Sequence, residues 1–119
     1  MGSPMLRGEI RLVDLDPVRR SEANKRRPAV IVSNDRANAS AARLGRGVIT
    51  VVPVTSNVDR IFAFQTLLQA AATGLGRDSK AQAEQVRSIA VERVGAVLGR
   101  APASVMAQVD DALRIHLQL

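Results

Sequence analysis

The chain contains no cysteine, which excludes disulfide scaffolds, thiolate metal sites and cysteine nucleophiles. Aromatic residues make up 2% of the 119 residues, with no Trp and no Tyr. This scarcity argues against a single-strand binder that depends on several stacking platforms. No run of about 18 apolar residues occurs, so the sequence predicts no membrane span.

The hydrophobic fraction of 46% predicts a folded chain, and the length predicts one domain. Residues 1–4 (MGSP) look like an expression scar, with Met5 as the native start and 5–119 as the domain. No apolar segment follows that start, so a signal peptide is not indicated and a cytoplasmic location is expected.

Basic residues outnumber acidic ones by 17 to 11, which gives a net charge of +6 and a pI of about 11.4. This balance favours a polyanionic partner, because contacts with phosphates release condensed counterions. A basic protein without such a partner stays open as the alternative.

Short segments rich in β-branched residues predict a mainly β fold with helices (α+β). The expected strands are 8–17, 28–33, 47–57, 61–69 and 84–94. Pro53 lacks a backbone donor, which predicts an edge position or a bulge in its strand. The glycine-containing segment 73–81 is expected to be a turn.

Two helices are expected. Residues 34–45 begin at a cap residue, Asn34 or Asp35, and end at Gly45. The second helix begins near Pro102, and its apolar positions recur every three or four residues at Val105, Met106, Val109, Leu113 and Leu117. Short strands closed by a C-terminal helix predict a small barrel or half-barrel.

The sequence offers no clustered metal ligands. Its single histidine, His116, shares a helix face with apolar residues, so a packed or interface histidine is favoured over a catalytic one. Asp14 and Asp16 would share a face of a strand and could form a carboxylate pair. A turn role for Asp16 and a hydrogen-bonding role for Asp14 are simpler.

Three cations, Lys25, Arg26 and Arg27, directly precede the apolar strand that begins at Pro28. If that strand neighbours the one that ends in Thr55 and Ser56, a guanidinium and two hydroxyls meet at one end of the sheet. Such groups could stabilise the charge that builds on phosphorus when a ribose 2′-hydroxyl attacks the adjacent phosphodiester. A solvated loop and an ordinary strand exit are the alternatives.

The chain resembles the MazF/PemK family of toxin endoribonucleases from about Arg7 to Leu119. The resemblance is carried by GEIRLVDLDP, SEANKRRPAVIVSN, VVPVTSN, EQVRSI and the terminal helix. The combination of RPAVIVS with VPVTS is its most specific part. The segment SNDRANA is most similar to the mycobacterial and deinococcal-type branch.

The resemblance implies an SH3-like, plasmid-maintenance-toxin β-barrel with a short helix after the second strand and a C-terminal helix. It further implies a homodimer that cuts single-stranded RNA without metal or another cofactor. The expected products carry a 2′,3′-cyclic phosphate and a 5′-hydroxyl. A cognate MazE-like antitoxin would inhibit the enzyme by placing an extended C-terminal segment in the RNA groove.

The resemblance assigns catalysis to Arg27 and Thr55, with Ser56 as a neighbouring hydroxyl that often assists. Lys25 and Arg26 would guide RNA into the groove, or remain part of a solvated loop. Glu22 could also pair with Arg27 or act as the general base, which stays unassigned. The positions that match residues contacting RNA bases or shaping the groove are Glu22, Asn24, Glu84 and Gln85.

One departure from the family concerns aromatic residues. Many relatives carry one where this chain has Arg11 or Leu12, whereas here only Phe62 and Phe64 are aromatic. Base stacking contributes about 1–3 kcal/mol per base to single-strand binding. The RNA motif that is cut therefore does not follow from the resemblance, whereas the phosphate chemistry does.

Two other functions compete with the nuclease. A gyrase poison on the same fold would need a C-terminal aromatic segment, and RIHLQL ends without one. A small RNA-binding module without catalysis would share the basic charge. Substitution of Arg27 separates these alternatives, because only an enzyme has turnover to lose.

Overall fold

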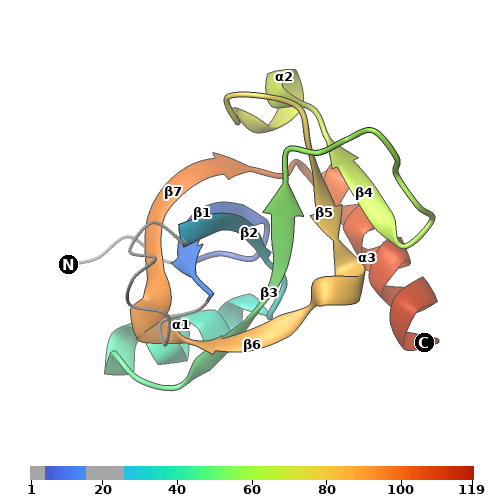
Figure 1. Cartoon of the computed structure of the whole chain (residues 1–119). Coiled ribbons are helices and arrows are strands. Elements are labelled where there is room, and N and C mark those ends of the chain that lie inside the picture. Colours follow the sequence, from blue (N-terminus) through green and yellow to red (C-terminus); the bar gives the residue numbers. More distant parts are fainter. Residues whose placement is uncertain (1–4, 16–25) are drawn as a thin grey trace.

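The computed structural model describes residues 5–15 and 26–119, which form an antiparallel seven-stranded sheet with three α-helices (Figure 1). The strands are β1 (Glu9–Asp14), β2 (Arg26–Ile31), β3 (Val48–Thr55), β4 (Gln65–Leu68), β5 (Ser79–Gln82), β6 (Arg87–Ala90) and β7 (Val94–Arg100). The helices are α1 (Asp35–Leu44), α2 (Ala70–Thr73) and α3 (Ala103–Leu117), with 3-10 helices η1 (Ala83–Gln85) and η2 (Val91–Arg93).

The sheet curls but stays open. Its hydrogen-bonded order is β4-β5-β3-β2-β1-β7, and β6 pairs with the first half of β3. Within the described ranges no pairing joins the edge strands β4 and β7. The predicted mainly β fold with its helix after the second strand and its C-terminal helix is confirmed, as a half-barrel and not a closed barrel.

Pro53 was predicted to lie at an edge or at a bulge; it lies in the central strand β3, so the edge alternative is wrong, and the strand is irregular at this point. On one side it pairs with Ala29 of β2. On the other side β3 pairs with β6 through Val48–Val51 and with β5 through Val54 and Thr55. Pro53 therefore lies where β3 changes partners, between the residues paired with β6 and those paired with β5, so its missing N–H interrupts neither ladder.

Two strands differ from the prediction. β5 overlaps the end of the segment 73–81, which was predicted to be a turn, and β7 follows the predicted strand 84–94. That expected strand is in fact η1, β6 and η2 in succession. Ser79 and Lys80 of β5 are buried although polar. Their strand lies inside the sheet, paired with β3 on one side and with β4 on the other. Polar strands of this kind show no alternation of apolar residues.

Each face of the sheet carries its own apolar cluster. One cluster contains Ile31 and Val51 and extends to Ala41 of α1. The other contains Val30 and Val52 and packs against α3. Successive residues of a strand point to opposite faces, so β2 from Ala29 onward and β3 as far as Val54 are apolar at nearly every position. The two cores therefore stop just short of Arg27 and Thr55.

The helix boundaries follow the predicted caps. The Asn34 side chain accepts a hydrogen bond from the backbone N–H of Ala37 and caps α1, which ends at Gly45 with a positive φ of 66°. α3 follows Pro102 and buries Met106 and Val109 as predicted. None of the helices in the described part of the chain is long and apolar enough to cross a membrane.

The last turn of α3 departs from the prediction. Leu117 was expected to be buried but is 48% exposed. His116 is exposed as well, so of its two predicted roles packing within this chain is wrong, whereas a place in an interface stays a prediction. The apolar face of α3 therefore contacts the sheet only through its first three turns.

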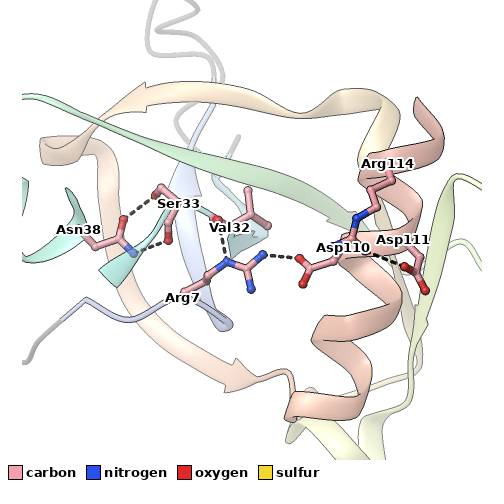
Figure 2. A network of polar contacts seen from close by, with 7 residues as sticks. All are labelled: Arg7, Val32, Ser33, Asn38, Asp110, Asp111 and Arg114. Atoms are coloured by element: carbon pink, nitrogen blue, oxygen red, sulfur yellow. Dashed lines mark hydrogen bonds and ion pairs between the residues drawn. The ribbon is translucent and has the colours of Figure 1, made fainter. Parts of the chain in front are cut away.

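A polar network ties β1, β2 and α1 to α3 (Figure 2). The Nε of Arg7 donates to the carbonyl of Val32 at 2.9 Å, and its guanidinium pairs with Asp110. The buried Asn38 donates from Nδ2 to the carbonyl of Ser33 at 2.8 Å. These contacts fix the end of β2 that follows Ile31.

Candidate active site

A pocket of about 420 Å³ opens where β2 begins and β3 ends. It is lined by Arg27, Pro28, Val54, Thr55, Ser56, Leu75, Gly76, Arg77, Ser79 and Leu98. Both predicted catalytic residues therefore lie on its wall, together with the neighbouring serine. Among the described residues that line this pocket none is acidic, and its two arginines make it a site for an anion.

The strand register explains why Arg27 and Thr55 meet. Ala29 pairs with Pro53 across the antiparallel β2 and β3. Arg27 precedes Ala29 by two residues and Thr55 follows Pro53 by two, so both lie at the same end of the strand pair. Because side chains alternate along a strand, they also belong to the same face of the sheet.

The site's donors are available for a ligand. Within 5–15 and 26–119, the guanidinium of Arg27 has no hydrogen-bond or ion-pair partner, and Arg27 is exposed. The Oγ1 of Thr55 accepts a hydrogen bond from the backbone N–H of Asn57 at 3.2 Å. Its hydroxyl proton therefore remains free to point at an oxygen in the pocket.

The far wall of the pocket is formed by residues that the sequence did not predict as part of the site. Arg77 and Ser79 come from the start of β5 and the connection into it, where Ser79 Oγ donates to the carbonyl of Arg77 at 3.1 Å. From its sequence this segment, GLGRDSK, is predicted to be only a turn. The isolated arginine in a glycine-containing connection was the signal that could have found it.

Several predicted RNA-contacting residues lie elsewhere. Arg26 lines a separate pocket of about 150 Å³ with Asp14 and Glu92. Glu84 and Gln85 belong to η1 and do not line the Arg27 pocket. The Oε2 of Glu84 accepts a hydrogen bond from Gln65 Nε2 at 2.8 Å. The residues that fall outside the described ranges are Glu22, Asn24, Lys25, Asp16 and the segment 1–4.

No group of three or more His, Asp or Glu side chains lies together as potential metal ligands within the part of the chain that the structure describes. The chemistry of the pocket itself is that of guanidinium and hydroxyl groups. These donors fit a phosphate and offer no carboxylate or imidazole to a cation.

Comparison with known proteins identifies the family of the chain. Residues 6–117 match the model of the PemK-like, MazF-like toxin of type II toxin–antitoxin systems. The chain is 65% identical to endoribonuclease MazF9 of Mycobacterium tuberculosis, over 97% of this chain and 98% of that protein.

Two solved structures share the fold. MazF from Deinococcus radiodurans superposes with a TM-score of 0.74 at 26% identity, over 99% of this chain and 100% of that one. A MazE–MazF complex from the same organism gives a TM-score of 0.74 at 25% identity, with 99% of both chains covered. The resemblance found in the sequence is thereby confirmed, and the chain belongs to the PemK-like, MazF-like toxin family of type II toxin–antitoxin systems.

Proposed function

We propose that the chain is the endoribonuclease toxin of its toxin–antitoxin pair and that it cuts single-stranded RNA at the Arg27 pocket. The observation that carries this proposal is the meeting of Arg27, Arg77, Thr55 and Ser56 in one pocket whose described lining contains no acidic residue. The family and the endoribonuclease MazF9 that is 65% identical support it.

The pocket suits an internal transesterification. The ribose 2′-oxygen forms a bond to the adjacent phosphorus while the bond from phosphorus to the 5′-oxygen breaks. The 2′-hydroxyl loses its proton and the leaving 5′-oxygen gains one. The products are a 2′,3′-cyclic phosphate and a 5′-hydroxyl, and the nucleophile is already held beside its target.

The two catalytic side chains have distinct roles in this proposal. Arg27 presents a planar fork of donors to two phosphate oxygens and stays protonated at every relevant pH. Thr55 donates its hydroxyl to an oxygen whose charge grows in the transition state. Ser56 and Arg77 add a second hydroxyl and a second cation. The reaction needs no metal ion, because these donors carry the charge stabilisation.

The partners follow from the same proposal. An antitoxin covers the pocket, as the type II family and the MazE–MazF complex of Deinococcus radiodurans support. The chain works in the cytoplasm as a homodimer whose RNA groove takes residues from both copies. Lys25 and Arg26 guide RNA towards the groove, and Glu22, Asn24 and Gln85 match positions that contact RNA bases or shape the groove in the family.

Incubation of a long unstructured RNA with the protein in excess EDTA tests the proposal, with Arg27→Ala as the matched variant. We expect discrete cuts whose 5′ fragments end in a 2′,3′-cyclic phosphate by mass, and none with the variant. Intact RNA that is nevertheless bound would favour the RNA-binding module without catalysis. Inhibition of gyrase with intact RNA would favour the non-enzymatic toxin.

A further inference from the structure

The loop between β3 and β4 carries both aromatic residues of the chain. The rings of Phe62 and Phe64 are stacked, with centroids 5.2 Å apart and planes 3° from parallel. The guanidinium of Arg60 lies over the Phe62 ring, 5.4 Å from its centroid. Phe62 is nevertheless 42% exposed. An exposed ring topped by a cation is a surface that the fold alone does not require.

Two tethers hold this loop in place. The ammonium of the buried Lys80 donates to the carbonyl of Arg60 at 2.6 Å. Gln65 forms two hydrogen bonds with Phe62. Its side-chain Oε1 accepts from the Phe62 N–H at 3.1 Å, and its backbone N–H donates to the Phe62 carbonyl at 2.9 Å. The backbone on both sides of the Phe62 ring is therefore fixed before any ligand binds.

Glu84 supports the second tether from behind. Its Oε2 orients Gln65 through the 2.8 Å hydrogen bond from Nε2. Its Oε1 is buried and has no hydrogen-bond partner among the described residues. A buried carboxylate oxygen without a donor is unfavourable, and the contact with Gln65 accounts for the presence of the carboxylate there. Glu84 is thus a positioning residue for the loop.

The loop lies next to the phosphate pocket. Lys80 is the direct partner of Thr55 across β3 and β5. Neighbouring strands are about 5 Å apart, so one strand spacing and one lysine side chain separate Thr55 from the Arg60 carbonyl. An RNA strand whose phosphate lies at Arg27 and Thr55 can reach the stacked rings with a nearby nucleotide.

We propose that Phe62 is a base-stacking platform that holds one nucleotide of the RNA beside the cut site; this inference rests on the proposed function. A base takes the place of the Arg60 guanidinium on the ring. An exposed cation–π contact contributes about twofold to fivefold to an equilibrium constant, whereas stacking of a base contributes about fivefold or more. The base therefore displaces Arg60, which then faces the adjacent phosphate.

The charges around the rings favour RNA over a protein ligand. Arg60 borders the Phe62 ring and Lys80 lies beneath the loop. The neighbouring pocket contains two arginines, and its lining within 5–15 and 26–119 includes no acidic residue. A nucleotide can stack its base on the Phe62 ring and place its phosphate near the cations. Such stacking accepts any base, because every base has a π face.

The test uses RNA that contains the mapped cut motif, with 2-aminopurine placed at each position in turn and a 2′-deoxy group at the cut site to prevent cleavage. Stacking on the ring quenches 2-aminopurine fluorescence. Phe62→Ala removes the ring, Phe62→Tyr keeps it, and Ile61→Ala removes a neighbouring exposed apolar side chain. Cleavage of the all-ribose RNA gives kcat and KM for each protein.

We expect quenching at one position with the unaltered protein, with Phe62→Tyr and with Ile61→Ala, and its loss with Phe62→Ala. The KM of Phe62→Ala should rise about fivefold or more while kcat at saturating RNA stays unchanged. An unchanged KM and quenching pattern overturns the platform, as does a fall in kcat alone. Weakened binding of the antitoxin with unaltered RNA kinetics would reassign the rings to protein docking. Failure of the unaltered protein to cut RNA would instead overturn the proposed function.

Discussion

The polar groups at the two ends of β2 differ in whether they have partners within the protein. After Ile31, the carbonyls of Val32 and Ser33 accept hydrogen bonds from Arg7 and Asn38, and Arg7 pairs with Asp110 (Figure 2). At the start of the strand, Arg27 is exposed and has no partner among the described residues. Groups at the first end stabilise the fold, whereas those at the second are available to a ligand.

Arginines on neighbouring strands repeat the contrast. Arg11 of β1 is buried, pairs with Glu9 at 3.0 Å and donates to the carbonyl of Gly95 at 3.1 Å. Arg27 of β2 lines the pocket. A buried guanidinium needs protein partners because burial removes its water. An exposed guanidinium keeps its hydrating water and is available to bind a phosphate. Loss of Arg27 should therefore lower activity and leave stability unchanged, whereas loss of Arg11 should lower stability and leave activity unchanged.

The largest effect should come from Arg27→Ala, which removes the phosphate donors. We expect kcat to fall by about 10²–10³-fold, the usual loss for a transition-state donor, with an unchanged denaturant midpoint. Arg27→Lys should recover only part of the activity, because it restores charge without the bidentate fork. A rate for Arg27→Ala within tenfold of the original would contradict the site.

Arg11→Ala should show the opposite pattern. It leaves the buried Glu9 carboxylate without its cation, which costs about 3 kcal/mol of unfolding free energy, measured by urea titration. The kcat per folded molecule should stay the same. A double change of Glu9→Leu with Arg11→Met should recover much of the stability, since apolar pairs often replace buried ion pairs at little cost. A stable but inactive Arg11→Ala would break the comparison.

A glycine pair tests how the pocket wall is held. A Cβ at Gly99 of β7 would lie 2.5 Å from the carbonyl of Thr73 and 3.4 Å from Leu75, whereas a Cβ at Gly76 would meet nothing within 4 Å. We expect Gly99→Ala to cost about 2 kcal/mol through overpacking and to lower activity by shifting the segment that carries Arg77. Gly76→Ala should be nearly silent in thermal melts. Equal effects would argue against this packing.

The smallest effect should come from Arg77→Gln. An exposed second cation contributes mainly to phosphate attraction, so kcat/KM should fall about tenfold at low salt and less at high salt. Arg43→Gln, on the exposed side of α1, is the control for the loss of one charge. Identical behaviour of the two variants would place Arg77 outside the site.

Local patterns in the sequence were enough for much of this structure. Asn34 and Gly45 mark the ends of α1, and the RPAVIVS and VPVTS segments bring Arg27 and Thr55 to one pocket. The family is confirmed from nearly the whole chain. These features depend on short-range preferences or on a strand pair that is apolar on both faces.

The features that were missed depend on tertiary pairing. Ser79 and Lys80 become strand residues only because β3 and β4 flank them, and Pro53 fits a central strand only because β3 changes partners there. Arg77 lines the pocket because the strand that follows it, β5, pairs with the end of β3. Residue types alone did not distinguish Arg26, which lines another pocket, from Arg27.

The pocket's lining runs from Arg27 near the start of the chain to Leu98 on β7. No shorter stretch of the growing polypeptide contains the whole wall, so a ribosome cannot release a working site until most of the protein has left its exit tunnel. A toxin that cuts RNA is thereby inactive during most of its own synthesis, and a message broken upstream of Leu98 yields a fragment without the complete pocket.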